Sequence, residues 1–452
     1  MTTPPNCQPS DAEQATLFDL PPADDPTPTQ EVGVGRPRLR RANREQVVFR
    51  ALPLDALIAE DHTARAIWAY VEGLDLQTLY HAIGSVHGGS GRAATDPRIL
   101  LALWLYATVE GIGSARELDR LCRDHLAYQW IAGDVPMNYH TLADFRTDHL
   151  ALLDGLLTRS IATLVAEGLV DLNRVAQDGM RVRASAGAAS FRRRPTLDEA
   201  LTQAEAQVQA LRDEVEEDPA AADRRQKGAR QRAARERVER VKAALGRLPE
   251  MEAKKKPEEV ERARCSTTDA EATVMKMADG GFRPAYNVQF ATAVGGQAIL
   301  GVDVIASGSD AGQMAPMVEQ VRGRCGVVPP EMLVDGGFAQ HDQIDAVSGA
   351  GCTVYAPVPK PRDPKVDRYE PKPGDSEVVT AWRARMATDQ AKVIYKDRAA
   401  TAECVNALAR GRGLLQFLVR GLAKVRAVAL WHAVAHNMMR IATLRAAAVG
   451  KA

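Results

Sequence analysis

The sequence predicts an α/β fold, in which a mixed five-stranded sheet carries helices on both faces. Three observations support this prediction. Apolar residues recur at helical spacing through residues 47–170, residues 285–360 alternate as strands do, and residues 196–250 carry two charged amphipathic repeats. An all-helical region should therefore precede the sheet, and a charged helical hairpin should interrupt it. The predicted parts are 1–46 (tail and basic arm), 47–170 (helical), 171–195 with 266–445 (α/β core) and 196–265 (hairpin insert).

The composition excludes several protein classes. The chain has 452 residues with 58 Lys+Arg and 58 Asp+Glu, so no net charge draws it to nucleic acid and any basic surface must be local. Its six cysteines form no Cys-x-x-Cys pair, which favours free thiols in a reducing cytosol over a zinc ribbon or a disulfide framework. The N-terminus lacks a signal-peptide pattern, and the longest apolar run, ILLALWLYATV, is too short to span a bilayer. We expect a soluble, cytoplasmic protein without membrane contact.

The first 46 residues contain a disordered tail and a basic arm. Residues 1–30 are rich in Pro, Asp and Thr and lack periodicity, which predicts disorder. The segment GRPRLRRANR follows, and its Gly-Arg-Pro-Arg start resembles an AT-hook, which lies in the minor groove of A·T-rich DNA. A plain solvated linker remains the alternative. The candidate DNA contacts are Arg36, Arg38, Arg40 and Arg41.

The helical region contains a helix, a short turn and a second helix. DPRILLALWLYATV precedes the turn EGIGS and the segment SARELDRLCRDH, where Ser114 and Glu117 have the spacing of a capping box. This outline fits a DNA-binding helix-turn-helix, and it equally fits a hairpin that only packs. A third helix is predicted from Thr141 through the segment ending LVAEG.

The hairpin insert changes the character of the chain. Apolar positions spaced by three and four occur twice, on either side of EEDPAAAD, which predicts two antiparallel helices of coiled-coil type. The second arm is basic, with ten Lys/Arg and three Asp/Glu between Ala222 and Arg247. Either a solvated helix face or a surface that contacts phosphates explains this charge.

Two aspartates end strands that the fold should bring together. Asp178 lies on the strand NRVAQDGMRV, and a β-hairpin and a helix follow before the strand EMLVDGG ends in Asp335. A further helix, a strand and closing helices complete an RNase H-like order. In that order the first and fourth strands are parallel neighbours about 4.8 Å apart, so the two carboxylates should lie close together.

Adjacent carboxylates repel each other unless cations neutralise them, and their hard oxygens suit Mg²⁺ or Mn²⁺. A pair of such ions can activate a water or a 3′-hydroxyl and stabilise the leaving oxygen of a phosphodiester. A third acidic ligand is expected, and Glu403 on a closing helix is the candidate. An aspartate at a strand end can also simply cap a turn. The rival acidic residues are Asp303, Asp389 and Asp397.

Several long segments, covering roughly residues 45–445, resemble the DD-E transposases of bacterial insertion sequences. The resemblance is to the branch with a helical N-terminal domain, of the IS-five and IS-eleven-eighty-two type. It rests on DPRILLALWLYATVEGIGSARELDRLCRDHLAYQWIAG, VAQDGMRVRASAG, FRPAYNVQFATA, LVDGGF and the segment from YKDRAATAECVNALARG to NMMRI.

The resemblance implies a magnesium-dependent enzyme, with manganese as a substitute, that hydrolyses phosphodiesters at element ends and transfers strands into target DNA. It implies metal ligands at Asp178, Asp335 and Glu403. The family's tyrosine–arginine–glutamate–lysine signature falls on Tyr395, Arg398, Glu403 and Arg410, where arginine stands in the lysine position. The side chains of Tyr395, Arg398 and Arg410 would contact DNA phosphate. At position 410 the planar guanidinium of arginine replaces the compact ammonium of lysine.

The implied partners are terminal inverted repeats and target DNA, bound by a homodimer at the bacterial nucleoid. The helical region and the basic arm are the expected readers of the repeats. Two alternatives remain open. One is an RNase H-like nuclease that performs no strand transfer, and the other is a catalytically silent DNA-binding protein derived from a transposase.

Overall fold

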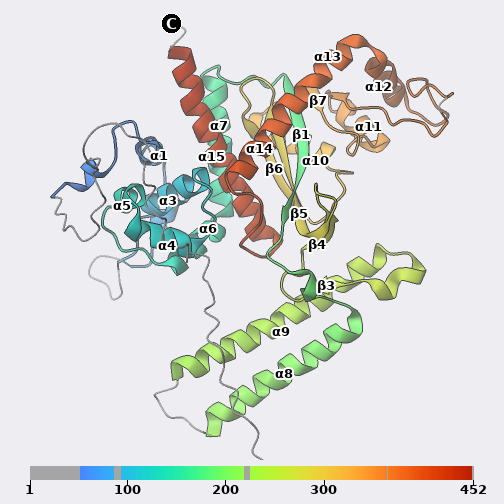
Figure 1. Ribbon diagram of the computed structural model, residues 1–452. Helices are drawn as coiled ribbons and strands as arrows, with labels where there is room; N and C mark the ends of the chain where they lie inside the picture. Colours follow the sequence, from blue (N-terminus) through green and yellow to red (C-terminus); the bar gives the residue numbers. More distant parts are fainter. Residues whose placement is uncertain (1–50, 86–92, 218–223, 364, 450–452) are drawn as a thin grey trace, which may run out of the picture. The chain divides into compact units, whose positions relative to one another are not determined.

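The computed structural model describes residues 51–85, 93–217, 224–363 and 365–449 (Figure 1). The chain divides into two units, 1–51 and 52–452, and the helices and strands of the described residues all belong to the second. The predicted tail and the arm with Arg36, Arg38, Arg40 and Arg41 lie outside the described residues.

The N-terminal part of the second unit is helical, as predicted. Asp96 caps α3 by accepting a hydrogen bond from the Arg98 amide, with Pro97 at the first helical position. Ser114 caps α4 through the Glu117 amide, but the Glu117 carboxylate pairs with Arg120 and does not close the predicted capping box. The elements are η1 (Leu54–Leu57), α1 (Thr63–Glu72), α2 (Gln77–His81), α3 (Pro97–Val109), α4 (Ala115–Asp124), α5 (Leu126–Ala132), α6 (Tyr139–Asp148) and α7 (Leu150–Ala166).

The single third helix predicted from Thr141 is wrong, because the chain leaves helical geometry at His149 and forms α6 and α7 instead. Apolar periodicity continues across this bend, so the pattern alone does not reveal the break. Among the described residues no single helix is long and apolar enough to cross a membrane. By length and composition, α6 and α7 meet that test only as a pair bent by 64°.

The central sheet has the predicted RNase H-like order. Strand β1 pairs antiparallel with β5 and parallel with β7; β8 follows β7, and β6 lies beyond β5. The sheet has six strands and not the predicted five, because the short β4 also pairs with β5. Ala285 of β5 pairs with Arg183 of β1 on one side and with Thr273 of β4 on the other. Strand β4 therefore lies on the same side of β5 as β6 does. The strands are β1 (Arg174–Arg183), β4 (Thr273–Lys276), β5 (Phe282–Ala293), β6 (Ile299–Ile305), β7 (Glu331–Leu333) and β8 (Thr353–Tyr355).

Helices cover both faces of this sheet. Side chains alternate along a strand, so Asp178 and Gln177 point to opposite faces. The Gln177 amide donates to the Gln313 carbonyl at the start of α10, while Asp178 accepts from Asn406 on α14. The helices after the hairpin are α10 (Met314–Cys325), α11 (His341–Gly349), α12 (Glu377–Ala387), α13 (Asp389–Arg398), α14 (Cys404–Gly411) and α15 (Leu422–Val449).

The charged insert consists of α8 (Arg194–Glu217) and α9 (Arg224–Ala253), which lie side by side (Figure 1). At its base β2 (Phe191–Arg192) pairs with β3 (Cys265–Ser266), and a 3-10 helix, Pro257–Arg262, follows α9. The insert has a small core of its own, made by Leu197, Val241, Ala244, Leu248, Ala263 and Cys265.

Helix α15 connects the helical region to the sheet. It contacts α3, α6 and α7 on one side and β6 on the other. Trp431 is fully buried, its ring lies 6.5 Å from that of Trp104, and its indole nitrogen donates to the Arg146 carbonyl at 2.9 Å. One hydrophobic core therefore runs from the helical region into the sheet.

Candidate active site

Asp178 and Asp335 occupy matching positions on neighbouring parallel strands. Ala176 of β1 is paired with Leu333 of β7, and each aspartate lies two residues beyond its member of that pair. Two residues preserve the side-chain direction, and adjacent strands lie about 4.8 Å apart. The register therefore places the two residues near each other beyond the end of β7, close enough for the charge of Asp335 to raise the pKa of Asp178.

Asp178 is held by three groups. Its Oδ1 accepts from the Gly179 amide at 3.0 Å, its Oδ2 accepts from the Asn406 side-chain amide at 3.0 Å, and Arg398 Nη1 lies 3.7 Å from Oδ1. Burial raises the pKa of Asp178, and the charges of Asp335 and Asp310 raise it further, while Arg398 opposes them. Burial and the neighbouring carboxylates thus disfavour the charged form of Asp178.

Asp310 is a further carboxylate near this site, on the opposite face of β1 from Asp178, and the sequence interpretation missed it. It accepts hydrogen bonds from the side-chain amides of Asn287 at 2.7 Å and Gln289 at 2.6 Å. A Cβ atom at Gly179 would lie 2.3 Å from Asp310 Oδ1, so the carboxylate occupies the space that the missing side chain leaves. Asp310 lies in the loop SGSDAG after β6, where no strand end or motif marks it.

Glu403 lies within a continuous helical stretch and not at the start of a helix. Helix α13 begins after Thr388, which caps it, and the backbone stays helical through a π-helical turn, Ala399–Glu403, into α14. The turn contacts both β1 and β5. Single π-helical turns inside α-helices occur frequently at functional sites, because they shift the phase of the side chains that follow.

Arg398 connects Glu403 to Asp178. Its Nη2 lies 3.8 Å from Glu403 Oε1, and its Nη1 lies 3.7 Å from Asp178 Oδ1. Glu403 and Asp178 therefore stand on two sides of one guanidinium. The Glu403 side chain is 65% exposed, whereas that of Asp178 is 19% exposed.

The rival acidic residues have other partners. Asp397 forms an ion pair with Arg174 at 2.5 Å, and Arg174 also binds Glu331, so Asp397 joins α13 to β1 and β7. Asp389 is 97% exposed and pairs with Lys392. Asp303 lies within β6, 3.8 Å from Arg426.

Two family models match the chain. The one described as "Transposase domain (DUF772)" matches residues 52–148, and the one described as "Transposase DDE domain" matches residues 261–438. The chain belongs to the DDE transposases of insertion sequences. No curated protein and no solved structure matches it significantly.

The match to the DDE domain begins at residue 261, beyond α9, so Asp178 of the transposase lies outside it. Asp335 and Glu403 lie inside it. The candidacy of Asp178 therefore depends on strand register, which pairs β1 with β7 across the insert.

The supporting residues of the transposase separate into two groups. The Arg398 guanidinium lies 5.9 Å from the centre of the Tyr395 ring, and burial raises the pKa of Tyr395, with the charges of Asp335 and Asp178 adding to it. Tyr395 is thus part of the carboxylate cluster. Arg410 is exposed at the end of α14, and within the described part of the chain its side chain makes no hydrogen bond or ion pair.

The carboxylate oxygens are donors that suit a hard divalent cation. Yet nowhere in the described ranges are three His, Cys, Asp or Glu side chains gathered closely enough to hold a metal ion. Asp178 and Asp335 provide one pair of neighbouring carboxylates, and Glu403 lies beside Arg398. The oxygen atoms of these carboxylates fit the divalent metal that the family implies.

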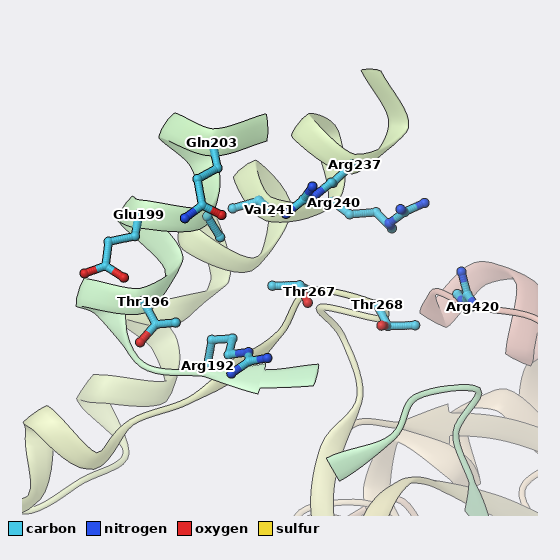
Figure 2. Close-up of a pocket in the computed structure, with 11 residues that line it drawn as sticks. Arg192, Thr196, Glu199, Gln203, Arg237, Arg240, Val241, Thr267, Thr268 and Arg420 are labelled. Atoms are coloured by element: carbon cyan, nitrogen blue, oxygen red, sulfur yellow. The ribbon is translucent and has the colours of Figure 1, made fainter. Parts of the chain in front are cut away.

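A basic groove of about 480 Å³ lies where the hairpin insert meets the core (Figure 2). It is lined by arginines from β2, from α9 and from the loop before α15, with Glu199 as its only acidic lining residue. Arg237 and Arg240 come from the basic second arm, and Figure 2 shows them on the same groove as Thr267 and Thr268. The four arginines are Arg192, Arg237, Arg240 and Arg420.

Proposed function

We propose that this transposase hydrolyses the phosphodiester at the ends of its element and joins the freed 3′-hydroxyl to target DNA. Asp178, Asp335 and Glu403 are the proposed ligands of Mg²⁺, with Mn²⁺ as a substitute. The observation that carries the proposal is the strand register that sets Asp178 beside Asp335, with Arg398 linking Asp178 to Glu403.

Bound divalent ions would neutralise the carboxylates, activate the attacking oxygen and stabilise the leaving one. Side chains and backbone amides of the protein orient the proposed ligands. The Asn406 amide and the Gly179 amide fix the two oxygens of Asp178. The Glu403 carboxylate is exposed, and its only ion pair in the described structure is the 3.8 Å contact with Arg398, so it is free to turn toward the aspartates. Arg398, Tyr395 and Arg410 are the proposed contacts for DNA phosphate.

Strand transfer separates this function from its alternatives. Purified protein should join a precut element-end duplex with a free 3′-hydroxyl to plasmid DNA in the presence of Mg²⁺. A nuclease without strand transfer would cut DNA and give no joined product. For a silent DNA-binding protein, Asp178→Ala would leave the protein's cellular effect unchanged.

The metal-ligand role of Asp335 predicts a change of metal preference. Asp335→Cys exchanges a hard oxygen for a sulfur ligand, which binds Mg²⁺ poorly and accepts softer divalent ions better. We expect cleavage in Mg²⁺ to fall at least about 100-fold and to recover in part in Mn²⁺. Cleavage rates in the two metals measure this effect, with Asp342→Cys on the surface of α11 as the control. Equal losses in both metals would argue against metal ligation by Asp335.

The proposed partners are the terminal inverted repeats and target DNA, bound by a homodimer that acts on the bacterial nucleoid in the cytoplasm. The helical region and the arm with Arg36, Arg38, Arg40 and Arg41 are the proposed readers of the repeats. The basic groove of the hairpin insert would contact the DNA backbone, because arginines from β2, from α9 and from the loop before α15 converge there with little opposing charge.

The groove predicts a change in the salt dependence of DNA binding. The double variant Arg237→Gln, Arg240→Gln should lower the slope of log affinity against log salt by up to about 1.8, since each lost phosphate contact removes about 0.9. Titrations of a fluorescent duplex at several salt concentrations measure the slope. Arg262→Gln is the matched control, because Arg262 is an exposed arginine of the insert outside the groove. Equal slopes would exclude the groove as a DNA contact.

A further inference from the structure

A second cavity, of about 200 Å³, lies between the helical region and the loop after α14. The turn at Gly111–Gly113 forms one wall, residues 412–418 form another, and Arg146 and His432 also line it. The two walls meet closely, since a Cβ atom at Gly413 would lie 2.7 Å from the Gly111 carbonyl oxygen. The exposed side chains of Leu415 and Leu418 also line the cavity.

Arg146 brings a buried positive charge to this cavity. Its side chain is 8% exposed, it donates to the Gly113 carbonyl, and its guanidinium lies 4.7 Å from the centre of the Trp104 ring. Its Nε has no hydrogen-bond partner, and no acidic side chain in the described ranges pairs with it. Burial lowers the pKa of Arg146 to about 10, which leaves it charged at neutral pH.

Two further nitrogen-bearing side chains face the same space. Arg412 is partly buried, and its side chain makes no ion pair or hydrogen bond with the described residues. The Nδ1 of His432 is buried without a partner. Burial lowers the pKa of His432 to about 3, and the charges of Arg146 and Arg412 add to this, so the histidine is neutral and the two arginines stand near it.

Buried charges in proteins are normally paired or bound to an ion of opposite sign. Here the guanidinium groups of Arg146 and Arg412 line one cavity, and no carboxylate lines it among the described residues. The Nε of Arg146 has no hydrogen-bond partner. A water takes up about 30 Å³ of liquid, so the cavity has room for a tetrahedral anion. Arginine is the side chain best suited to bind phosphate oxygens, because its planar donors match their geometry.

We propose that this cavity binds a phosphate-type oxyanion through Arg146 and Arg412, with His432 lining the site. The anion would join the turn between α3 and α4 to the loop that follows α14. It is either a free inorganic ion or a backbone phosphate of bound DNA. The site is separate from the carboxylate cluster and does not depend on the proposed catalysis.

Thermal unfolding of the full-length protein tests the free ion. Sodium phosphate, compared with sodium chloride at equal ionic strength, should raise the melting temperature of the wild type in a saturable way, because a ligand that binds only the folded state stabilises it. Arg412→Gln should lose most of this rise, and Arg412→Lys should keep part of it. Arg322→Gln, a surface arginine of α10 paired with Glu319, should respond as the wild type does.

DNA binding tests the second source. If a backbone phosphate fills the cavity, Arg412→Gln should lower the salt slope of duplex binding by about 0.9 relative to Arg322→Gln. A phosphate-specific rise in melting temperature with an unchanged slope would instead identify the free ion. Should Arg412→Gln fail to fold, Leu415→Asp places a competing carboxylate on an exposed lining position and should abolish both responses. The proposal would be overturned if phosphate did not raise the melting temperature of the wild type and Arg412→Gln did not change the salt slope. It would also be overturned if the variants behaved as the wild type does in both experiments.

Discussion

Asp178→Asn is expected to reduce the cleavage of element-end DNA by about 10³-fold or more while leaving the fold intact. The amide can still accept from Gly179, but it no longer offers the charged oxygens that a divalent cation needs. Gel assays of cleavage and joining measure the loss, and circular dichroism checks the fold. Asp389→Asn is the matched control, because Asp389 is 97% exposed and pairs only with Lys392. Retained cleavage in the Asp178 variant would exclude the proposed site.

The same substitution should raise the melting temperature at neutral pH. Burial raises the pKa of Asp178, and the Asp335 and Asp310 charges add to it, so the ionised carboxylate opposes folding. A group whose pKa is raised on folding loses its contribution to stability as pH rises through the folded-state pKa. The stability gain of Asp178→Asn should therefore shrink as pH falls toward about 4, where an unfolded aspartate titrates. A variant less stable than the wild type at pH 7 would contradict this electrostatic account.

Gly179→Ala should disrupt the site even though it alters no ionisable group. The added Cβ would lie 2.3 Å from Asp310 Oδ1, 2.5 Å from Gln289 Nε2 and 2.7 Å from Asn287 Oδ1. These three polar side chains bind one another, so they cannot move apart without losing hydrogen bonds. We expect a loss of about 1–3 kcal/mol in the free energy of unfolding, as for other overpacked sites, together with a loss of cleavage.

Gly246→Ala provides the contrast. Gly246 lies within α9, and a Cβ atom there would have no neighbour within 4 Å. Alanine should stabilise that helix by up to about 1 kcal/mol and leave cleavage unchanged. Denaturant titrations of both variants measure the two effects. Equal stability of the two variants would show that the space at Gly179 is not limiting.

Much of the fold follows from local patterns. The alternation in β5 and β6, the buried strand before Asp335 and the helices between them give the RNase H-like order. That order already implies the parallel pairing of β1 with β7. Strand β4 and the bend at His149 were missed, because a four-residue strand and a one-residue break leave little trace in hydrophobic periodicity.

The candidate site was only partly predictable. The glycines after Asp178 and Asp335 predict a strand end at both positions. This is wrong for Asp178, because β1 continues to Arg183 in its pairing with β5, whereas Asp335 does lie just beyond the end of β7. The register of β1 with β7 still makes the two residues neighbours. Asp310 lies in a loop without a distinctive pattern, and only the packing of β5 and the gap at Gly179 bring it to the other carboxylates. The π-helical turn that ends at Glu403 was also missed, since small residues such as those of AATAE suit an α-helix equally well.

The sequence by itself indicated most of the element order, the family and the two candidate aspartates, because these depend on periodicity and on motifs read along the chain. Only the tertiary structure decided which charges meet. It brought Arg398 between Asp178 and Glu403, gave Asp397 to Arg174, and left Arg146 and Arg412 sharing a cavity without a carboxylate. Electrostatic interactions depend on distance and burial in space. A single sequence does not reveal which residues more than 200 positions apart will come into contact.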